Sequence, residues 1–114
     1  MDADAIHRYE ALLHDLQSTL RSEIENSSDA TAPVELDGTM GRISRGDAMQ
    51  VQQMALEMKR RRQERLERVR TALQRIDEGT YGLCGRCERP ISSARLDAFP
   101  DVVMCVRCAS GPGR

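Results

Sequence analysis

The chain has 114 residues and a formal net charge of −1, and only 3% of its residues are aromatic. A length of this order is a prior for one domain. Because so few rings cannot build an aromatic-rich core, the composition favours an elongated helical molecule over an enzyme with a roomy substrate pocket. No apolar run reaches the ~18–20 residues that span a bilayer, and the N-terminus is acidic. We therefore expect no membrane segment, no secretory signal and a cytoplasmic location.

Charge is distributed unevenly along the chain. Residues 1–37 carry nine acidic and two basic side chains, whereas residues 59–75 carry eight basic and two acidic ones. The basic stretch needs an anionic partner. That partner could be nucleic acid, a nucleotide, an acidic protein surface or the acidic first third of the same chain.

A first helix is expected over about residues 5–27. Its apolar residues recur at steps of three and four, which places them on one helix face. These residues are Ile6, Tyr9, Leu13, Leu16, Leu20 and Ile24. Asp2 and Asp4 suit the positive end of the helix dipole. Residues 28–43 lack periodicity and contain Pro33, so we expect them to form a loop at the tip of a hairpin.

A second helix is expected over about residues 44–78. Ser44 and Asp47 form a capping pattern at its start, and Gly79 is a natural C-cap. Its seam follows alternating steps of four and three. The seam residues are Ala48, Gln52, Ala55, Lys59, Arg62, Leu66, Val69, Leu73 and Ile76. Since neither helix can bury its stripe alone, the two are predicted to form an antiparallel hairpin, with the acidic first helix against the basic middle of the second.

All four cysteines lie near the C-terminal end, in a C-x2-C-x17-C-x2-C pattern. The predicted metal ligands are Cys84, Cys87, Cys105 and Cys108. Two tight turns with this spacing bring four sulfurs onto one ion, so we expect one structural Zn²⁺ with no open position for catalysis. A pair of disulfides would need an oxidising compartment, and a redox C-x-x-C would need a strand–helix–strand context, neither of which the sequence indicates.

These elements define the expected architecture. The fold class is mainly α, with an antiparallel two-helix coiled-coil hairpin over residues 1–79. A small C4 zinc-finger module over residues 80–109, with a short C-terminal helical segment, follows it, and residues 110–114 are expected to form a flexible tail. In such a molecule the zinc ion replaces the core that the last 35 or so residues lack.

Two motifs linked to the cysteines point to a known family. The run Arg75-Ile76-Asp77-Glu78-Gly79-Thr80-Tyr81-Gly82 leads into the first cysteine pair, and Arg95-Leu96-Asp97-Ala98-x-Pro100 precedes the second. This combination resembles the DksA/TraR family of bacterial transcription factors. The resemblance covers residues 44–109 well and the first helix only by pattern.

The resemblance implies a non-enzymatic transcription regulator that binds RNA polymerase directly rather than a DNA sequence. In the family the hairpin enters the secondary channel of the polymerase, and its acidic tip approaches the catalytic centre and changes the lifetime of promoter complexes. In some members the effect is coupled to ppGpp, the alarmone of the stringent response. The expected partners are therefore RNA polymerase and ppGpp, with no membrane partner, and we expect a monomer.

The tip of the family hairpin carries the pattern D-x-x-D-x-A. The corresponding segment here, residues 41–48, keeps one acid. Asp47 and the following Ala48 are the tip candidates, and Asp37 is a distant second. Asp47 also suits the capping role described above, and the two roles are compatible.

The resemblance also implies contacts for basic side chains. The predicted ppGpp or polymerase contacts are Arg61, Arg65, Arg68 and Arg95. Of these, Arg61 and Arg68 match basic positions that contact the nucleotide in responsive members. Arg65 occupies a position that is apolar in the family, and Arg95 matches a position that docks members on the channel rim. Ala109 replaces a basic residue of the family. A salt-bridged coiled-coil face is the alternative for the clustered arginines, and charge balance for the zinc thiolates is the alternative for Arg95.

Two other functions stay open on the sequence. A zinc-finger nucleic-acid binder using residues 59–75 would show a steep salt dependence, but the near-neutral charge and the few aromatics count against it. A coiled-coil adaptor is the third interpretation. His7 and His14 share a helix face at a spacing too long for one metal ion, so we expect both at the surface.

Overall fold

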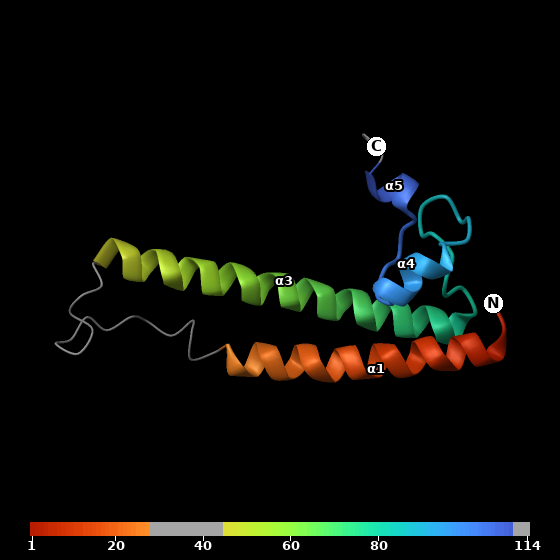
Figure 1. Ribbon diagram of the computed structural model, residues 1–114, viewed down its shortest axis with the longest axis horizontal. Helices are drawn as coiled ribbons and strands as arrows, with labels where there is room; N and C mark the ends of the chain where they lie inside the picture. The colour runs from red at the N-terminus through yellow and green to blue at the C-terminus, as the bar shows by residue number, and fades with distance from the viewer. Residues whose placement is uncertain (28–44, 111–114) are drawn as a thin grey trace.

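The computed structural model describes residues 1–27 and 45–110 of the chain. Its helices are α1 (Ala3–Asn26), α3 (Arg45–Glu78), α4 (Ser93–Ala98) and α5 (Val106–Ser110). In Figure 1, α1 and α3 lie side by side, and the segment that carries α4 and α5 lies at the C-terminal end of α3. The described residues contain no strand, only an isolated β-bridge between Leu83 and Pro90. The predicted mainly helical fold class is confirmed.

Local sequence determines where α1 begins and ends. The Asp2 side chain accepts a hydrogen bond from the Ala5 N–H at 2.7 Å, so the helix begins at Ala3, two residues before the predicted start. At the other end, Ser27 donates its hydroxyl to the Ile24 carbonyl at 2.7 Å. Side chains that satisfy free backbone groups at helix ends are the usual reason that a helix stops at such residues. The described helices include none that is long and apolar enough to cross a membrane.

Gly79 ends α3 in the way that the sequence predicts. Its φ is +78°, a left-handed conformation that glycine adopts without a Cβ clash. The Gly79 N–H donates to the Ile76 carbonyl at 3.2 Å, and the Thr80 N–H donates to the Arg75 carbonyl at 2.9 Å. This pair of bonds is the Schellman motif, which turns the chain sharply out of the helix and into the cysteine-containing module. The capping role predicted for Ser44, at the start of α3, lies outside the described residues.

The predicted apolar stripes form the core of the hairpin. Every residue of the α1 stripe is buried or partly buried, and along α3 the apolar C-terminal half of the seam is the best covered part. Ala72 is also buried, although the seam pattern does not include it. At 1.5 Å per residue, the 34 residues of α3 extend roughly 50 Å.

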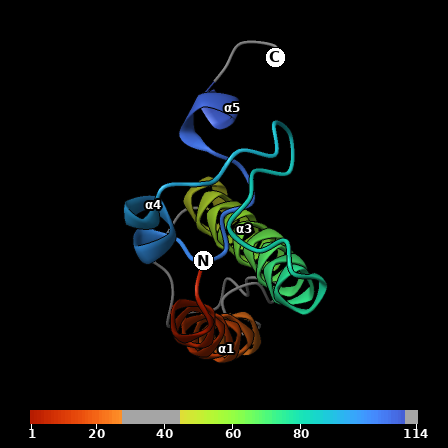
Figure 2. The same ribbon diagram turned by 90° about the vertical axis from the view of Figure 1, so that its right-hand side faces the viewer.

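The cysteine-containing module shares its core with the base of the hairpin. Tyr81, Ile91 and Leu96 belong to the same buried cluster as Tyr9 and Val69. Figures 1 and 2 show α4 close to α3, with α5 farther from α1. The module is therefore seated on the hairpin by direct packing, and the two parts are joined by more than a linker.

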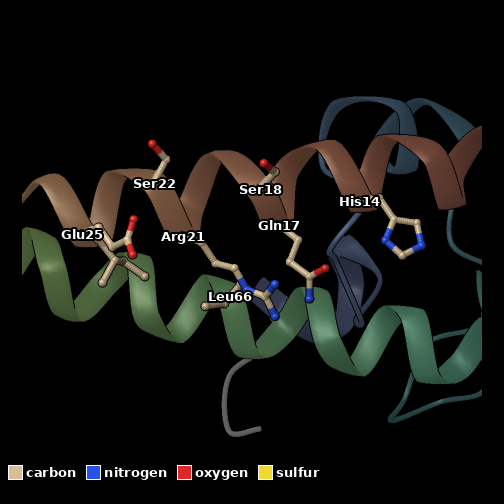
Figure 3. A pocket seen from close by; sticks show the side chains of 8 residues that line it. His14, Gln17, Ser18, Arg21, Ser22, Glu25 and Leu66 are labelled. Atoms are coloured by element: carbon tan, nitrogen blue, oxygen red, sulfur yellow. The ribbon is translucent and has the colours of Figure 1, made fainter.

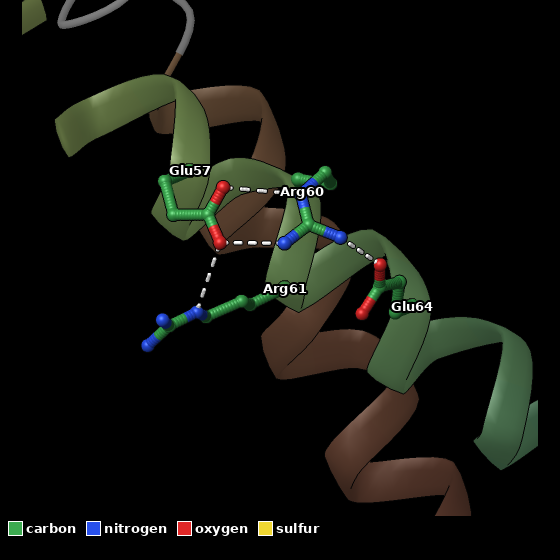
Figure 4. Close-up of polar contacts among 4 residues, drawn as sticks. All are labelled: Glu57, Arg60, Arg61 and Glu64. Atoms are coloured by element: carbon green, nitrogen blue, oxygen red, sulfur yellow. Dashed lines mark hydrogen bonds and ion pairs between the residues drawn. The ribbon is translucent and has the colours of Figure 1, made fainter. Parts of the chain in front are cut away.

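Part of the basic stretch of α3 is neutralised within its own helix. Arg60 pairs with Glu57 and Glu64, and Arg61 also pairs with Glu57, as Figure 4 shows. Within the described residues one ion pair joins the two long helices, Arg62 to Glu23 at 3.6 Å. Packing of acidic α1 against basic α3 therefore involves less direct pairing than the charge pattern predicts, because neighbours three and four residues away on α3 are closer partners.

Candidate metal centre and arginine pocket

Two turns and a short helix bring the four cysteines together. In the first turn the Cys84 N–H donates to the Arg89 carbonyl at 2.8 Å, and the Glu88 N–H donates to the Cys84 carbonyl at 2.9 Å. The second pair lies where α5 begins, and there the Ala109 N–H donates to the Cys105 carbonyl at 2.9 Å. Backbone hydrogen bonds thus fix both loops before any metal is considered.

The four sulfurs fit a tetrahedral zinc ion. All four Sγ atoms lie within 4.8 Å of one another, and those of Cys87 and Cys105 are 3.8 Å apart. Ligands at the usual Zn–S distance of about 2.3 Å stand roughly 3.8 Å apart in a tetrahedron. The four thiols are free of disulfide bonds. They would hold one zinc ion in a closed site of four thiolates, where the metal stabilises the fold and has no position left for a reacting water.

Backbone N–H groups prepare two of the sulfurs for the metal. The N–H groups of Cys87 and Arg86 point at the Cys84 sulfur at 3.5 and 3.4 Å, and together with further hydrogen bonds they lower the pKa of Cys84 from 9.0 to about 5. The Cys108 N–H likewise lowers the pKa of Cys105. Burial disfavours the thiolate of Cys108 and raises its pKa to about 12. A bound cation would reverse this shift, because a coordinating thiol is deprotonated.

Arg75, in the last turn of α3, braces the first cysteine turn. Its Nη1 donates to the Leu83 carbonyl at 2.7 Å. Its guanidinium also lies against Gly85, where a Cβ would come within 2.9 Å of Nη2. The Gly85 N–H in turn donates to the Val103 carbonyl at 2.8 Å. A glycine here thus lets the arginine and both cysteine loops approach one another closely.

Replacing Arg75 with alanine should lower the free energy of unfolding by about 1–2 kcal/mol, because a charge-assisted hydrogen bond to a carbonyl is lost. Thermal unfolding followed by circular dichroism measures the change, and zinc content should stay at one ion per chain. Gln74→Ala, in the same turn of α3, is the control. Equal melting temperatures for Arg75→Ala and the wild type would show that the brace adds nothing to stability.

Three of the four predicted arginine contacts line one cavity. Arg65 and Arg68 from α3 and Arg95 from α4 border a space of about 540 Å³, together with Phe99, Asp101 and neighbouring apolar residues. The fourth, Arg61, lies elsewhere and is bound to Glu57 at 3.3 Å. The cavity lies where the hairpin meets the cysteine-containing module.

Asp101 is a charged residue of this cavity that the sequence patterns miss. Its carboxylate is buried and pairs with Arg65 at 3.3 Å and with Arg68 at 3.2 Å. Asp101 lies 36 residues from Arg65 and 33 from Arg68, so no local spacing could reveal the pairing. Arg95 donates its Nε to the Met104 carbonyl at 3.0 Å, one residue before a zinc ligand. This contact places its guanidinium beside the second cysteine loop, where the charge-balance interpretation of Arg95 requires it.

The motif around α4 also attaches the module to α1. The Tyr9 hydroxyl donates to Asp97 at 2.6 Å, and Arg8 reaches the same oxygen at 3.5 Å. The Tyr81 hydroxyl donates to the Pro100 carbonyl at 2.8 Å, and the Tyr9 and Tyr81 rings stand 5.6 Å apart. Two of the chain's few aromatic rings are therefore concentrated at this joint.

The predicted tip residues lie at the other end of the hairpin from the cysteines. Asp47 is an exposed acid in the first turn of α3, and Ala48 next to it is buried. The second tip candidate, Asp37, lies outside the described residues. In Figure 1 the whole length of α3 separates this turn from the zinc site.

A second cavity, of about 580 Å³, follows α1 where it faces α3. In Figure 3 the side chains of His14, Gln17 and Arg21 point toward α3, whereas those of Ser18 and Ser22 point away. Both histidines are exposed, as expected. Among the residues that the structure describes, the cysteines are the one group placed to hold a metal ion.

The helical hairpin and the four clustered thiols define a C4-type zinc-finger protein. The family model described as the prokaryotic dksA/traR C4-type zinc finger matches residues 79–112. This part of the chain is therefore similar to the zinc finger of DksA and its relatives, and its four clustered cysteines indicate one structural zinc ion as the cofactor.

Curated relatives match part of the chain. An uncharacterised protein of Aquifex aeolicus is 43% identical over 44 residues, which is 39% of this chain and 30% of that protein. The RNA polymerase-binding transcription factor DksA of Caulobacter vibrioides is 39% identical over 54 residues, 46% of this chain and 38% of that protein. Its namesake in Haemophilus influenzae is 30% identical over 63 residues, 54% of this chain and 43% of that protein. The matches thus span less than half the length of these relatives.

A solved structure shares the fold over nearly the whole chain. The transcription factor DksA2 from Pseudomonas aeruginosa superposes with a TM-score of 0.69 at 23% identity, covering 96% of this chain and 83% of that one. The hairpin, including the first helix, therefore has the same fold as DksA2. The sequence motifs alone related that helix to the family only by pattern.

Proposed function

We propose that this protein is a non-enzymatic transcription regulator that binds RNA polymerase and modulates initiation by inserting its hairpin into the secondary channel. The observation that carries the proposal is the arrangement along α3, which extends roughly 50 Å from an exposed acid to a zinc module. The DksA2-like fold and the polymerase-binding relatives in Caulobacter and Haemophilus support it. A molecule of this shape can reach into a narrow channel while its base stays at the rim.

The proposed roles follow from the position of each residue. Asp47 and Ala48 act at the tip, where the exposed acid would face the polymerase catalytic centre. Arg95 docks on the channel rim, and Arg61, whose side chain is 73% exposed, is a polymerase contact on the hairpin shaft. Arg65 and Arg68 would contact ppGpp, because guanidinium groups bind phosphate in a bidentate fashion.

The test separates docking from activity. We expect wild-type protein to co-purify with polymerase core and to change the lifetime of open complexes in transcription in vitro, with and without ppGpp. Asp47→Asn should keep polymerase binding and lose most of the effect on open complexes, because it removes the negative charge of the tip. Arg95→Ala should weaken binding about tenfold, the equivalent of about 1.4 kcal/mol.

The matched controls are Asp77→Asn and Arg89→Ala, two charged positions on α3 and in the first cysteine loop. Both should behave as the wild type, and every variant should retain its zinc. Wild-type protein that neither binds polymerase nor shifts initiation at any promoter would refute the proposed function. Binding to DNA or RNA with a steep salt dependence would favour the nucleic-acid interpretation instead.

A further inference from the structure

The carboxylate of Asp101 lies in the cavity between the hairpin and the zinc finger. The cavity is bordered by three arginines and by the exposed ring of Phe99, which has 53% of its surface accessible. The side chain of Asp101 is only 5% exposed, and its carboxylate faces Arg65 and Arg68. Two guanidinium groups that could bind a ligand phosphate are thus occupied by a residue of the same chain.

The hydrogen bonds of the Asp101 carboxylate are long, so an anion of higher charge can replace them. Arg65 approaches the carboxylate with Nη2 at 3.3 Å and Nε at 3.4 Å, and Arg68 with Nε at 3.2 Å. Charge-assisted N–H···O bonds are shorter when fully formed, about 2.7–2.9 Å. Within the described part of the chain, both arginines have Asp101 as their only ion-pair partner. One carboxylate therefore balances two cations at long distances.

We propose that Asp101 is a built-in competitor for the arginine pocket, so that a phosphate-bearing ligand enters only by displacing its carboxylate. The inference rests on the proposed function in that it concerns the pocket assigned there to ppGpp. The chemical class is a nucleotide with a pyrophosphate group. Such a group carries more charge than one carboxylate and can engage both guanidinium forks, while the exposed Phe99 ring offers a face for the base.

Displacement of the Asp101 side chain would change the contacts that hold the zinc finger on the hairpin. Asp101 follows Pro100, whose carbonyl accepts the Tyr81 hydroxyl, and it precedes Val103, whose carbonyl accepts the Gly85 N–H at 2.8 Å. The segment over residues 99–104 leads directly to the third zinc ligand. Ligand entry would therefore loosen the seat of the second cysteine loop on the hairpin, which links occupancy of the pocket to the position of the finger.

The test measures binding of inorganic pyrophosphate to the full zinc-loaded chain by titration calorimetry, without polymerase. Asp101→Asn removes the competing charge and should bind pyrophosphate at least tenfold more tightly than the wild type. Asp97→Asn is the matched control, since that nearby acid pairs with Tyr9 and Arg8 and not with the pocket arginines. Adding Arg68→Gln to Asp101→Asn should abolish the gain.

Hydrogen exchange of the wild type gives a second measurement that does not depend on how well Asp101→Asn folds. Saturating pyrophosphate should speed exchange at the Gly85 and Val102 amides, whose hydrogen bonds hold this segment. Equal or weaker binding by Asp101→Asn, slower exchange on ligand binding, or no pyrophosphate binding by either protein would each overturn the proposal. Because polymerase pull-down is independent of these readouts, failure here is distinguishable from failure of the proposed function.

Discussion

Removal of zinc is expected to unfold residues 80–109 and to lower the melting temperature of the whole chain by at least ~15 °C. Loss of a structural metal belongs to the few changes that cost about 4 kcal/mol or more, and each kcal/mol shifts the melting of a small domain by roughly 4–8 °C. The effect extends to the hairpin because Cys84 is part of the same buried cluster as Tyr9 and Leu13. Chelation followed by circular dichroism measures it, and added zinc should restore the transition.

Substitution of one ligand should reproduce the effect of chelation. Cys108→Ser leaves three sulfurs and should lose stoichiometric zinc, whereas Arg86→Ala, an exposed change inside the first cysteine turn, should retain it. Acid should also release the metal, since protons compete for the thiolates. The lowered pKa of Cys84 means that its thiolate stabilises the folded chain fully above pH 9.0, the ordinary pKa of a thiol. That stabilisation is lost as the pH falls to about 5. A chelated chain that melts like the zinc-loaded one would contradict this assignment.

The features that could be predicted from the sequence are those that repeat or lie close together in the chain. Ile6 and Leu13 could be assigned to the buried face of α1 because apolar spacing at three and four residues defines a helix face. Gly79 could be assigned to the end of α3 because few residues other than glycine adopt a positive φ there. The zinc cluster follows equally directly, because a C-x2-C turn is a local geometry and two of them make four ligands.

The contacts that escaped prediction join residues that are distant in sequence. Asp101 meets Arg65 across 36 positions, and Tyr9 meets Asp97 across 88. Spacing carries no information at such separations, since the pairing depends on how the finger folds back onto the hairpin. The opposite charges of α1 and α3 indicate that the two helices lie together. They do not identify the ion pairs, because Arg60 and Arg61 pair with Glu57 on their own helix.

The arginine pocket shows how the two kinds of information combine. Resemblance to the family selects Arg68 and Arg95, and the structure places both around one cavity together with Arg65, whose position is apolar in the family. It also adds Asp101, whose carboxylate is already paired with Arg65 and Arg68, so that these two arginines are not free for a phosphate. Regulation of this protein would then depend on a residue that the motif pattern does not include.

Tyr9→Ala is expected to cost about 3–5 kcal/mol of the free energy of unfolding, the range for deleting a buried ring. The Tyr9 side chain is buried, packs against the Tyr81 ring and bonds to Asp97, so its removal loosens the zinc finger from α1 as well as opening a cavity. Tyr9→Phe keeps the ring and should cost only about 1 kcal/mol, because the partly exposed Asp97 carboxylate can be hydrated instead. Thermal unfolding of the two variants separates packing from hydrogen bonding.

A control variant and the pH dependence of stability give a second test of the contact between Tyr9 and the zinc finger. Leu12→Ala, at an exposed neighbouring position of α1, should change stability by no more than about 0.5 kcal/mol. Burial and the bond to Asp97 raise the pKa of Tyr9 above 10.0. The protonated Tyr9 therefore contributes fully to the free energy of unfolding below pH 10, and this contribution is lost as the pH rises through the raised pKa. Tyr9→Phe should reduce that alkaline loss, and the part that remains comes from Tyr81, whose pKa burial also raises. A Tyr9→Ala protein that melts like Leu12→Ala would mean that the finger is held by α3 alone, through Arg75 and the pairs of Asp101.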